Sequence, residues 1–469
     1  MTNLEDDDNG TKLHVAMFPW LAFGHMVPYL ELSKLMVQKG HTVSFISTPR
    51  NIDRLLPRLP ENLSSAINFV KLPFSGGNKL PDDGEATTDV PFDLIPYFKI
   101  AFDGLQIPVT KFLESSKPDW ILHDFAPYWL PPISRRLGIK TGFFSAFTGA
   151  SLGIIKPPGF EEYRTSPEDL LTPPKWVPFE TPVSYRLFEC RFIFNGFLVE
   201  PIEGNVSDVH RFGGVIDGCD VIAIRSCYEY EAEWLRLIQD LHRKPVIPVG
   251  VLPPKLEEKF EDTDTWLSIK TWLDTHNKTS VVYVAFGSEV KLSQTELNEI
   301  AFGLELSGLP FFWVLKTQRG PWDTEPVKLP DGFEERTADR GMVWRGNWVE
   351  QLRILSHDSI GLLLTHPGWG TIIEAIRFAK PMVMLVFLYD QGLNARVVEE
   401  KEIGYMIPRD ESEGFFSRES VAKSLKLVME EDEGKVYREN VKDMKKVFGD
   451  MDRQDRYVDS FLDYLVTHR

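Results

Sequence analysis

Residues 360–371 read Ile-Gly-Leu-Leu-Leu-Thr-His-Pro-Gly-Trp-Gly-Thr, and this stretch decides the fold class. The apolar run Ile360–Leu364 predicts a buried strand, and the turn that follows contains a proline and two glycines. A helical pattern opens at Trp369. Since a buried strand, a short turn and a helix begin a β-α-β unit, the stretch predicts a parallel sheet.

The same alternation recurs along the chain. It is clearest at the start, where the apolar run His14–Phe18 precedes a helical pattern and the β-branched run Thr42–Ile46 follows it. Similar apolar runs predict further strands at residues 67–72, 120–123, 142–147, 221–224, 246–249, 281–286, 311–315, 342–344 and 382–387. Strands separated by helices favour an α/β protein with parallel sheets.

A change of composition divides the chain near its middle. Pro248–Asp264 is rich in proline and then in charge, which is typical of a linker. We therefore predict an N-terminal α/β domain at residues 1–250, a linker at 251–265, a second α/β domain at 266–448 and a helical tail at 449–469. Residues 156–197 have poor periodicity, so they form either a wall of a binding site or a packed surface excursion.

Composition excludes several classes of partner. The chain has 52 basic and 69 acidic residues, a net charge of −17, which argues against nucleic acids and anionic membranes. Its three scattered cysteines provide neither a disulfide framework nor a CxxC metal site. Its start is acidic and polar, and its longest apolar runs fall short of the ~20 residues of a membrane span. We expect a soluble cytoplasmic protein.

Two residues at predicted strand ends are candidates for acid–base chemistry. His25 lies between the first strand and the first helix, where open parallel sheets bind ligands, and a helix N-terminus favours its neutral form. Asp124 ends another strand and can face the same crevice, where a carboxylate would fix the tautomer of the imidazole. Taken alone, His25 can equally be a helix cap.

The block Trp348–Gln391 predicts a nucleotide site. Its small residues at a helix start can hold a phosphate on backbone N–H groups, and His366 can donate to a phosphate oxygen. Glu374, one turn later, can bind a ribose diol, and Trp348 offers a flat face to a base. A tight strand–helix turn with core tryptophans explains any one of these residues, but not their combination.

This block resembles the plant secondary-product signature of the UDP-dependent glycosyltransferases, W-x-P-Q … H-C-G-W-N-S … E … D-Q, over its full length. Phe18–Pro28 is similar to the catalytic-histidine loop of that family, and Ala285–Glu289 to its glycine–serine turn. The resemblance implies the GT-B fold, in which two Rossmann-like, doubly wound parallel-sheet domains face a cleft. The first would bind the acceptor and the second the UDP-sugar, with the tail packed back on the first.

The resemblance also implies an inverting reaction that needs no metal and no cofactor. Its donor site would consist of Ser288, Trp348, Val349, Gln351, His366, Gly368, Trp369, Gly370, Thr371, Glu374, Asp390 and Gln391. Trp348 and Val349 would bind uracil, Gln351 and Glu374 the ribose, and Asp390, Gln391 and Trp369 the sugar hydroxyls. The remaining residues would contact the pyrophosphate.

The first domain would supply the catalytic pair and the acceptor pocket. The resemblance makes His25 the general base on the acceptor hydroxyl and Asp124 its partner. Trp20, Phe23 and Phe147 would contact a small acceptor.

The turn departs from the family pattern. Pro367 and Gly370 replace the usual Cys and Asn, Thr371 replaces Ser, and Glu350 replaces the usual Pro. Gly370 lacks a side-chain amide worth ~1–2 kcal/mol to a charged phosphate, so we expect weaker donor binding. A UDP-sugar-binding protein without turnover remains an alternative.

Two other enzyme classes fit less well. Asp262–Asp264 and Asp450–Asp452 match the D-x-D of metal-dependent glycosyltransferases, but both lie in charged segments rather than at strand ends. A dehydrogenase would need G-x-G-x-x-G after its first strand, and the chain offers only Phe23-Gly-His25 there.

Within the family, the opening loop and Gly287-Ser-Glu289 are most similar to the branch-forming group. Those enzymes add glucose or rhamnose to a sugar already attached to a terpenoid, saponin or flavonoid. Asp390, Gln391 and Trp369 favour glucose, while similar sequences in the group are associated with rhamnose, so both donors stay open. We expect a monomer.

Overall fold

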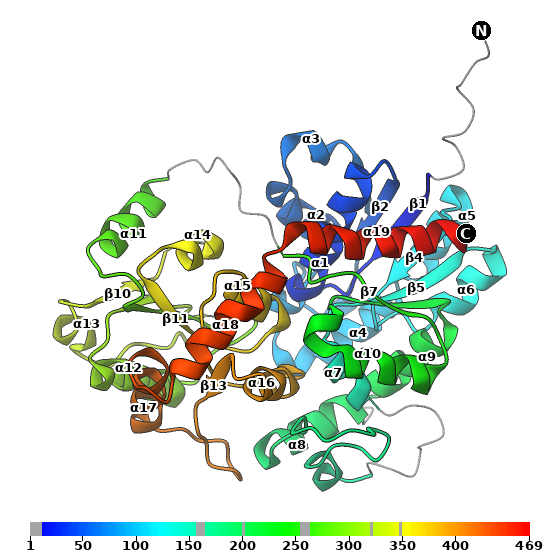
Figure 1. Ribbon diagram of the computed structural model, residues 1–469. Helices are drawn as coiled ribbons and strands as arrows, with labels where there is room; N and C mark the ends of the chain where they lie inside the picture. Colours follow the sequence, from blue (N-terminus) through cyan, green and yellow to red (C-terminus); the bar gives the residue numbers. More distant parts are fainter. Residues whose placement is uncertain (1–11, 156–164, 199–201, 254–262, 319–321, 347–348) are drawn as a thin grey trace. The chain divides into compact units, whose positions relative to one another are not determined.

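The computed structural model describes residues 12–155, 165–198, 202–253, 263–318, 322–346 and 349–469. The chain forms two compact units (Figure 1). Unit 1 comprises the described parts of residues 1–165, 193–252 and 452–469, and unit 2 those of 166–192 and 253–451. Each contains one parallel sheet, so the predicted α/β class is confirmed.

The sheet of unit 1 has seven strands in the order β3-β2-β1-β4-β5-β6-β7. The order reverses beside β1, whose two neighbours are β2 and β4, and all pairs are parallel. The carboxyl ends of β1 and β4 therefore flank the switch point where doubly wound sheets bind ligands. The strands are β1 His14–Phe18, β2 Thr42–Ser47, β3 Ile67–Lys71, β4 Trp120–His123, β5 Lys140–Ser145, β6 Val221–Ile224 and β7 Val246–Pro248.

Helices cover both faces of this sheet (Figure 1). Along β1, Val15 and Met17 enter one apolar core while Ala16 and Phe18 enter the other, as the alternation of side chains in a strand requires. The helices of unit 1 are α1 Phe23–Gln38, α2 Pro49–Leu55, α3 Glu61–Ser64, α4 Ile95–Asp103, α5 Gln106–Ser116, α6 Leu130–Leu137, α7 Gly149–Ile154, α9 Asp208–Gly218, α10 Tyr228–His242 and α19 Met451–Thr467.

The last helix packs on unit 1. The buried indole of Trp120, on β4, donates a hydrogen bond to the carbonyl of Leu465 at 3.0 Å. The side-chain oxygen of Gln454 accepts one from the backbone N–H of Val251 at 2.8 Å. These contacts fix α19 against the core that contains Phe461.

The sheet of unit 2 has six parallel strands in the order β10-β9-β8-β11-β12-β13. They are β8 Val281–Ala285, β9 Phe311–Val314, β10 Gly341–Trp344, β11 Ile360–Thr365, β12 Met382–Met384 and β13 Gly404–Met406. The helices are α8 Leu187–Ile193, α11 Asp264–Asp274, α12 Gln294–Ser307, α13 Phe333–Arg336, α14 Gln351–Ser356, α15 Trp369–Arg377, α16 Gln391–Glu400, α17 Arg418–Met429 and α18 Lys435–Phe448.

One segment lies apart from its neighbours in sequence. Residues 166–192 were predicted to be part of an N-terminal domain at 1–250, but they pack with unit 2. The buried Glu189 forms an ion pair with Arg396 on α16, which explains this placement. Most of the predicted linker, at 254–262, lies outside the described residues.

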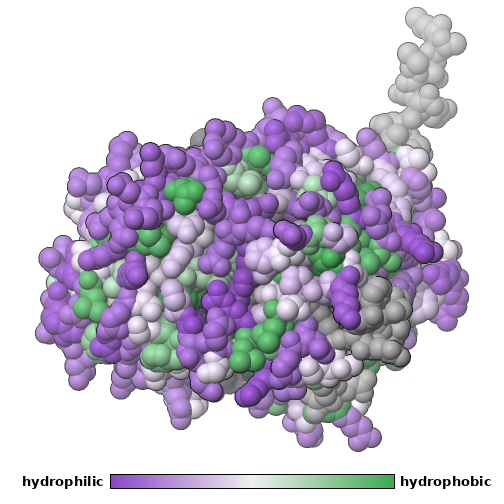
Figure 2. Space-filling model, turned by 60° about the horizontal axis from the view of Figure 1, so that its bottom comes forward, coloured by the Kyte–Doolittle hydropathy of each residue, from purple (hydrophilic) through white to green (hydrophobic). Residues whose placement is uncertain are grey.

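Hydrophilic residues predominate on the face shown in Figure 2, where hydrophobic residues form only small groups. Across the part of the chain that the structure describes, no helix has both the length and the apolar character needed to cross a membrane.

Candidate functional site

His25 and Asp124 meet at the switch point of unit 1. His25 is the third residue of α1, and Asp124 directly follows β4, the strand that pairs with β1. Nδ1 of His25 lies 2.7 Å from Oδ2 of Asp124, and the carboxylate is fully buried. The predicted pair thus forms from two segments about 100 positions apart in sequence.

Asp124 is held by two backbone donors as well. The N–H of Trp20 donates to Oδ2 at 3.2 Å, and the N–H of Phe125 donates to Oδ1 at 2.8 Å. A carboxylate that accepts from neighbouring N–H groups can only accept from the ring, so Nδ1 of His25 carries a proton. In the neutral imidazole the basic lone pair is therefore on Nε2.

The three residues predicted to contact the acceptor differ in their burial and in their neighbours. The indole of Trp20 is only 5% exposed and packs edge-on against Phe98 and Phe102, so its ring belongs to the core and its backbone orients Asp124. Phe147 is partly buried, and its ring centroid lies 4.9 Å from that of His25. Phe23 is partly buried too, beneath the guanidinium of Arg54. Phe147 is thus in ring contact with the imidazole, as is Phe125, whose centroid lies 5.9 Å from that of His25.

The predicted phosphate turn of unit 2 connects β11 to α15. His366 lies between two glycines: a Cβ on Gly287 would be 2.6 Å from its Cε1, and a Cβ on Gly368 would be 2.8 Å from its Nε2. Gly287 also has a φ of +69°, which L side chains rarely adopt. Burial lowers the pKa of His366 to about 4, so the ring is neutral near pH 7 and can donate one N–H.

Helix α15 begins at this turn. Gly368 is its N-cap with extended backbone, and no side chain caps it. The start of a helix can bind an anion through its first backbone N–H groups, so this turn has the geometry that the predicted pyrophosphate contact requires. The indole of Trp369 is 4% exposed and contacts Phe448, so its ring lies in the core rather than at a sugar; only its backbone suits that role.

Gln351 and Glu374, which were both predicted to contact a ribose, are hydrogen-bonded to each other. Nε2 of Gln351 donates to Oε2 of Glu374 at 2.6 Å. The hydroxyl of the buried Tyr283 donates to Oε1 of Gln351 at 3.3 Å, and burial raises the pKa of that tyrosine well above its usual range. Val349, which precedes Gln351 in the sequence, is buried. Trp348 lies outside the described residues.

Ser288 follows Gly287 in the turn after β8. Its carbonyl accepts a hydrogen bond from Nζ of Lys316 at 2.7 Å. This bond fixes the backbone beside Gly287, and it places a cation within the predicted pyrophosphate region.

Asp390 and Gln391 lie at the start of α16. Oε1 of Gln391 accepts from the backbone N–H groups of Phe387 and Leu388 at 2.9 and 3.1 Å, which leaves its NH₂ group as the donor. Tyr389, immediately before Asp390, has a φ of +42°, a strained backbone of the kind found at ligand sites. The predicted pair is thus held in a tight turn.

Asn394 was not predicted, yet it connects two parts of the predicted donor site. Its fully buried Nδ2 donates to the carbonyl of Pro367 at 3.1 Å and to Oδ2 of Asp390 at 2.8 Å. Asn394 therefore connects the predicted phosphate turn to Asp390, which was predicted to contact the sugar. Its position four residues after Asp390, one helical turn along α16, was the only signal in the sequence.

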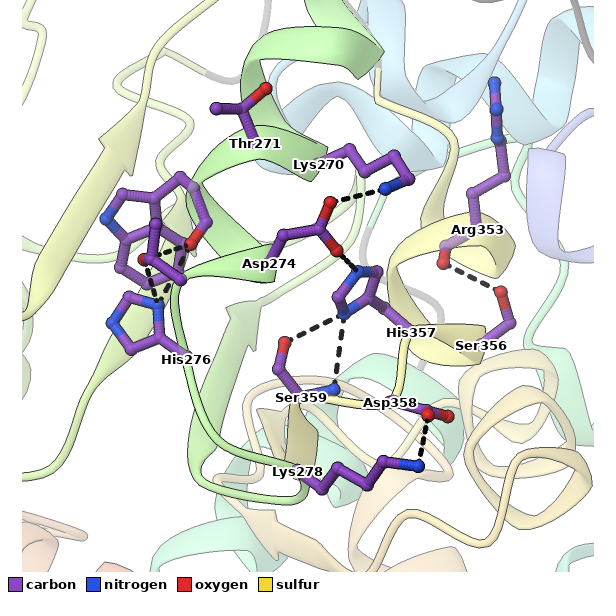
Figure 3. Close-up of polar contacts among 12 residues, drawn as sticks. Lys270, Thr271, Asp274, His276, Lys278, Arg353, Ser356, His357, Asp358 and Ser359 are labelled. Carbon is purple, nitrogen blue, oxygen red and sulfur yellow. Dashed lines mark hydrogen bonds and ion pairs between the residues drawn. The ribbon is translucent and has the colours of Figure 1, made fainter.

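A second histidine of the block lies at the opposite end of β11. His357 precedes the strand, and its Nδ1 and Nε2 contact Oγ of Ser359 at 2.9 Å and Oδ1 of Asp274 at 3.1 Å (Figure 3). Lys270 pairs with the same carboxylate and lowers its pKa. His357 thus ties α11 to the sheet and is remote from the phosphate turn.

Among the described residues, no three His, Cys, Asp or Glu side chains are grouped in a way that could hold a metal ion. Of the two D-x-D matches, Asp264 begins α11 while Asp262 lies outside the described residues. Asp450 and Asp452 lie where α18 gives way to α19, away from any strand end.

Comparison with known proteins places the chain in a family. The model of the family described as UDP-glucoronosyl and UDP-glucosyl transferase matches residues 260–468. UDP-glycosyltransferase 91A1 of Arabidopsis thaliana is 82% identical over 471 residues and 100% of both chains. Soyasaponin III rhamnosyltransferase of Glycine max is 40% identical, covering 99% of this chain and 98% of its own.

Solved structures share the fold. UGT73P12 of Glycyrrhiza uralensis, complexed with glycyrrhetinic acid 3-O-monoglucuronide, superposes with a TM-score of 0.81 at 22% identity, covering 97% of this chain and 96% of the other. The predicted GT-B fold with two Rossmann-like domains is therefore confirmed. The chain belongs to the plant family-1 UDP-glycosyltransferases, enzymes that transfer a sugar from a UDP-sugar donor.

Proposed function

We propose that this enzyme transfers a hexose from a UDP-sugar to a hydroxyl of a small acceptor with inversion, and that His25 is the general base. The supporting observation is the 2.7 Å contact between Nδ1 of His25 and the buried Asp124. With its proton on Nδ1, the ring takes the acceptor proton on Nε2, and Asp124 offsets the charge of the imidazolium that forms. The acceptor oxygen then attacks the anomeric carbon from the face opposite UDP.

The departing UDP is stabilised by dipoles in this proposal. The backbone N–H groups at the start of α15 and one N–H of the neutral His366 would bind the pyrophosphate. Gln351 and Glu374, already hydrogen-bonded to each other, would hold the ribose. A transferase built in this way needs no metal for leaving-group departure.

Glucose is the first candidate for the transferred sugar. The carboxylate of Asp390 and the NH₂ group of Gln391 can bond hydroxyls that a 6-deoxy sugar partly lacks. Rhamnose is the second candidate, because a relative 40% identical over nearly the whole chain is named a rhamnosyltransferase.

The acceptor is proposed to be a sugar hydroxyl on a terpenoid, saponin or flavonoid glycoside. The same relative carries soyasaponin in its name, and Phe147 presents an aromatic edge beside His25. An aromatic ring next to the base suits an acceptor that is largely apolar.

A donor-by-acceptor matrix tests the proposal. Mass spectrometry would follow UDP-glucose and UDP-rhamnose, each with aglycones and with monoglycosides, for the wild-type enzyme and His25→Ala. We expect transfer to monoglycosides, lost in the variant. Transfer to aglycones alone would remove the branch-forming assignment, and UDP-sugar binding without transfer to any acceptor would leave a binding protein.

A further inference from the structure

A short segment from the first half of the chain lies beside the residues that are proposed to bind the donor sugar. We define the strap as residues 187–192, which form most of α8 and belong to unit 2. The strap contacts α16, the helix that begins at Gln391.

The strap is anchored by a buried ion pair. Oε2 of Glu189 lies 3.1 Å from Nη2 of Arg396, and the two side chains are only 5% and 6% exposed. Nη1 of the same arginine donates to the carbonyl of Gly392 at 3.3 Å. Burial raises the pKa of Glu189, which Arg396 opposes. A buried ion pair of this kind fixes geometry, because neither charge can move away from its partner without remaining uncompensated.

The strap also makes direct contact on both sides of the proposed sugar pair. On one side, a Cβ on Gly392 would lie 2.4 Å from Oε1 of Glu189, so the carboxylate rests on the backbone of this residue. On the other side, the ring of Phe192 lies 5.8 Å from that of Tyr389, centroid to centroid. Tyr389 has the strained φ of +42°, which persists only where the surroundings hold it.

Asp390 and Gln391 are therefore bracketed by residues that the strap touches. We propose that the strap positions these two residues for the sugar of the donor, with Glu189 as a positioning residue that acts through Gly392 and Arg396. This inference rests on the proposed function. It implies that the strap affects binding of the sugar and not of UDP, since the proposed UDP contacts come from α14, α15 and the turn after β8.

Isothermal titration of the full-length enzyme with UDP and with UDP-glucose separates the two effects. For Glu189→Gln and Glu189→Ala we expect the Kd of UDP-glucose to rise about 5- to 10-fold, the equivalent of one hydrogen bond, with the Kd of UDP unchanged within about 2-fold. Gly392→Ala should act in the same way, and combining it with Glu189→Ala should weaken binding no further, because both disturb one contact.

Two further variants distinguish a specific effect of the strap from general damage to the fold. Glu299→Gln breaks another carboxylate–arginine pair of unit 2, between the buried Glu299 and the more exposed Arg418, away from α16, and should change neither Kd. Phe192→Ala removes a ring that is 37% exposed, so the fold should tolerate it while UDP-glucose binding weakens.

Equal weakening of UDP and UDP-glucose in the strap variants would overturn the inference, because it would indicate a purely structural strap. Unchanged affinities would overturn it as well. If the wild-type enzyme bound neither ligand, the proposed function itself would fail, and this outcome is distinguished by the wild-type titration alone.

Discussion

Asp124→Asn changes one oxygen of the carboxylate that holds His25, and its effect follows from the hydrogen bonds. The two oxygens accept three N–H groups, from His25 Nδ1 and Trp20 at Oδ2 and from Phe125 at Oδ1. An asparagine has one acceptor oxygen and one NH₂ group. At least one of the three N–H groups must therefore face another donor.

Each orientation of the amide has its own consequence. With its oxygen toward His25, the tautomer is kept, the N–H of Phe125 is unsatisfied, and the imidazolium loses its compensating charge. With its NH₂ toward His25, the ring proton moves to Nε2 and the lone pair moves to Nδ1. Nε2 can then no longer take the proton of the acceptor hydroxyl. A wrong tautomer of this kind costs ~10⁴ in kcat in serine proteases, so we expect a loss of ~10²- to 10⁴-fold here. One unsatisfied buried N–H lowers the free energy of unfolding by ~1–3 kcal/mol.

The assay measures acceptor-dependent UDP release at saturating substrates, UDP affinity by calorimetry and urea unfolding. We expect the Kd of UDP to stay within about 2-fold of wild type, because the proposed UDP contacts lie in unit 2. Asp103→Asn is the matched control: its carboxylate accepts from Arg211 and Trp129 in the same unit, so it should lose stability but keep kcat. A kcat of Asp124→Asn within about 3-fold of wild type would contradict the proposed role of Asp124 in holding His25.

Two further predictions concern single contacts, and a third concerns a buried histidine. Gly287→Ala forces a Cβ against His366 and should weaken UDP binding ~10-fold or more; an unchanged Kd by calorimetry would contradict the proposed role of that ring. Asn394→Ala should raise the KM for UDP-glucose and lower the free energy of unfolding by ~2 kcal/mol, whereas a wild-type KM would separate this residue from Asp390. Burial lowers the pKa of His123 from 6.5 to about 4, so the unfolded state binds more protons between these values and stability falls as the pH drops from about 6.5 towards 4. His123→Phe should flatten that dependence in calorimetric unfolding, and an unchanged slope would point to other groups.

Of the strands that the structure describes, local patterns in the sequence predicted all but β13. The strands His14–Phe18, Trp120–His123 and Val221–Ile224 have the bounds that their apolar runs predicted. β13, Gly404–Met406, was missed because it begins with a glycine, a residue that is depleted in strands.

Side-chain direction and long-range packing were not predictable in this way. Trp20 and Trp369 were predicted to lie at the site, but their rings are buried in the core. The packing of the strap with unit 2 was not predicted, because the ion pair of Glu189 and Arg396 joins residues about 200 positions apart, which no local pattern reveals. Asn394 was missed for the same reason, since its partner Pro367 lies on another element.

In the proposed mechanism, a neutral His25, held by Asp124, takes the acceptor proton while UDP leaves. Proton NMR of one reaction tube tests this mechanism, because the spectra follow both the release of UDP and the anomeric configuration of the product. We predict a β-linked glucoside from the α-linked UDP-glucose, with equal amounts of UDP and product, and loss of both signals in His25→Ala. Retained configuration, or wild-type turnover by His25→Ala, would contradict the account.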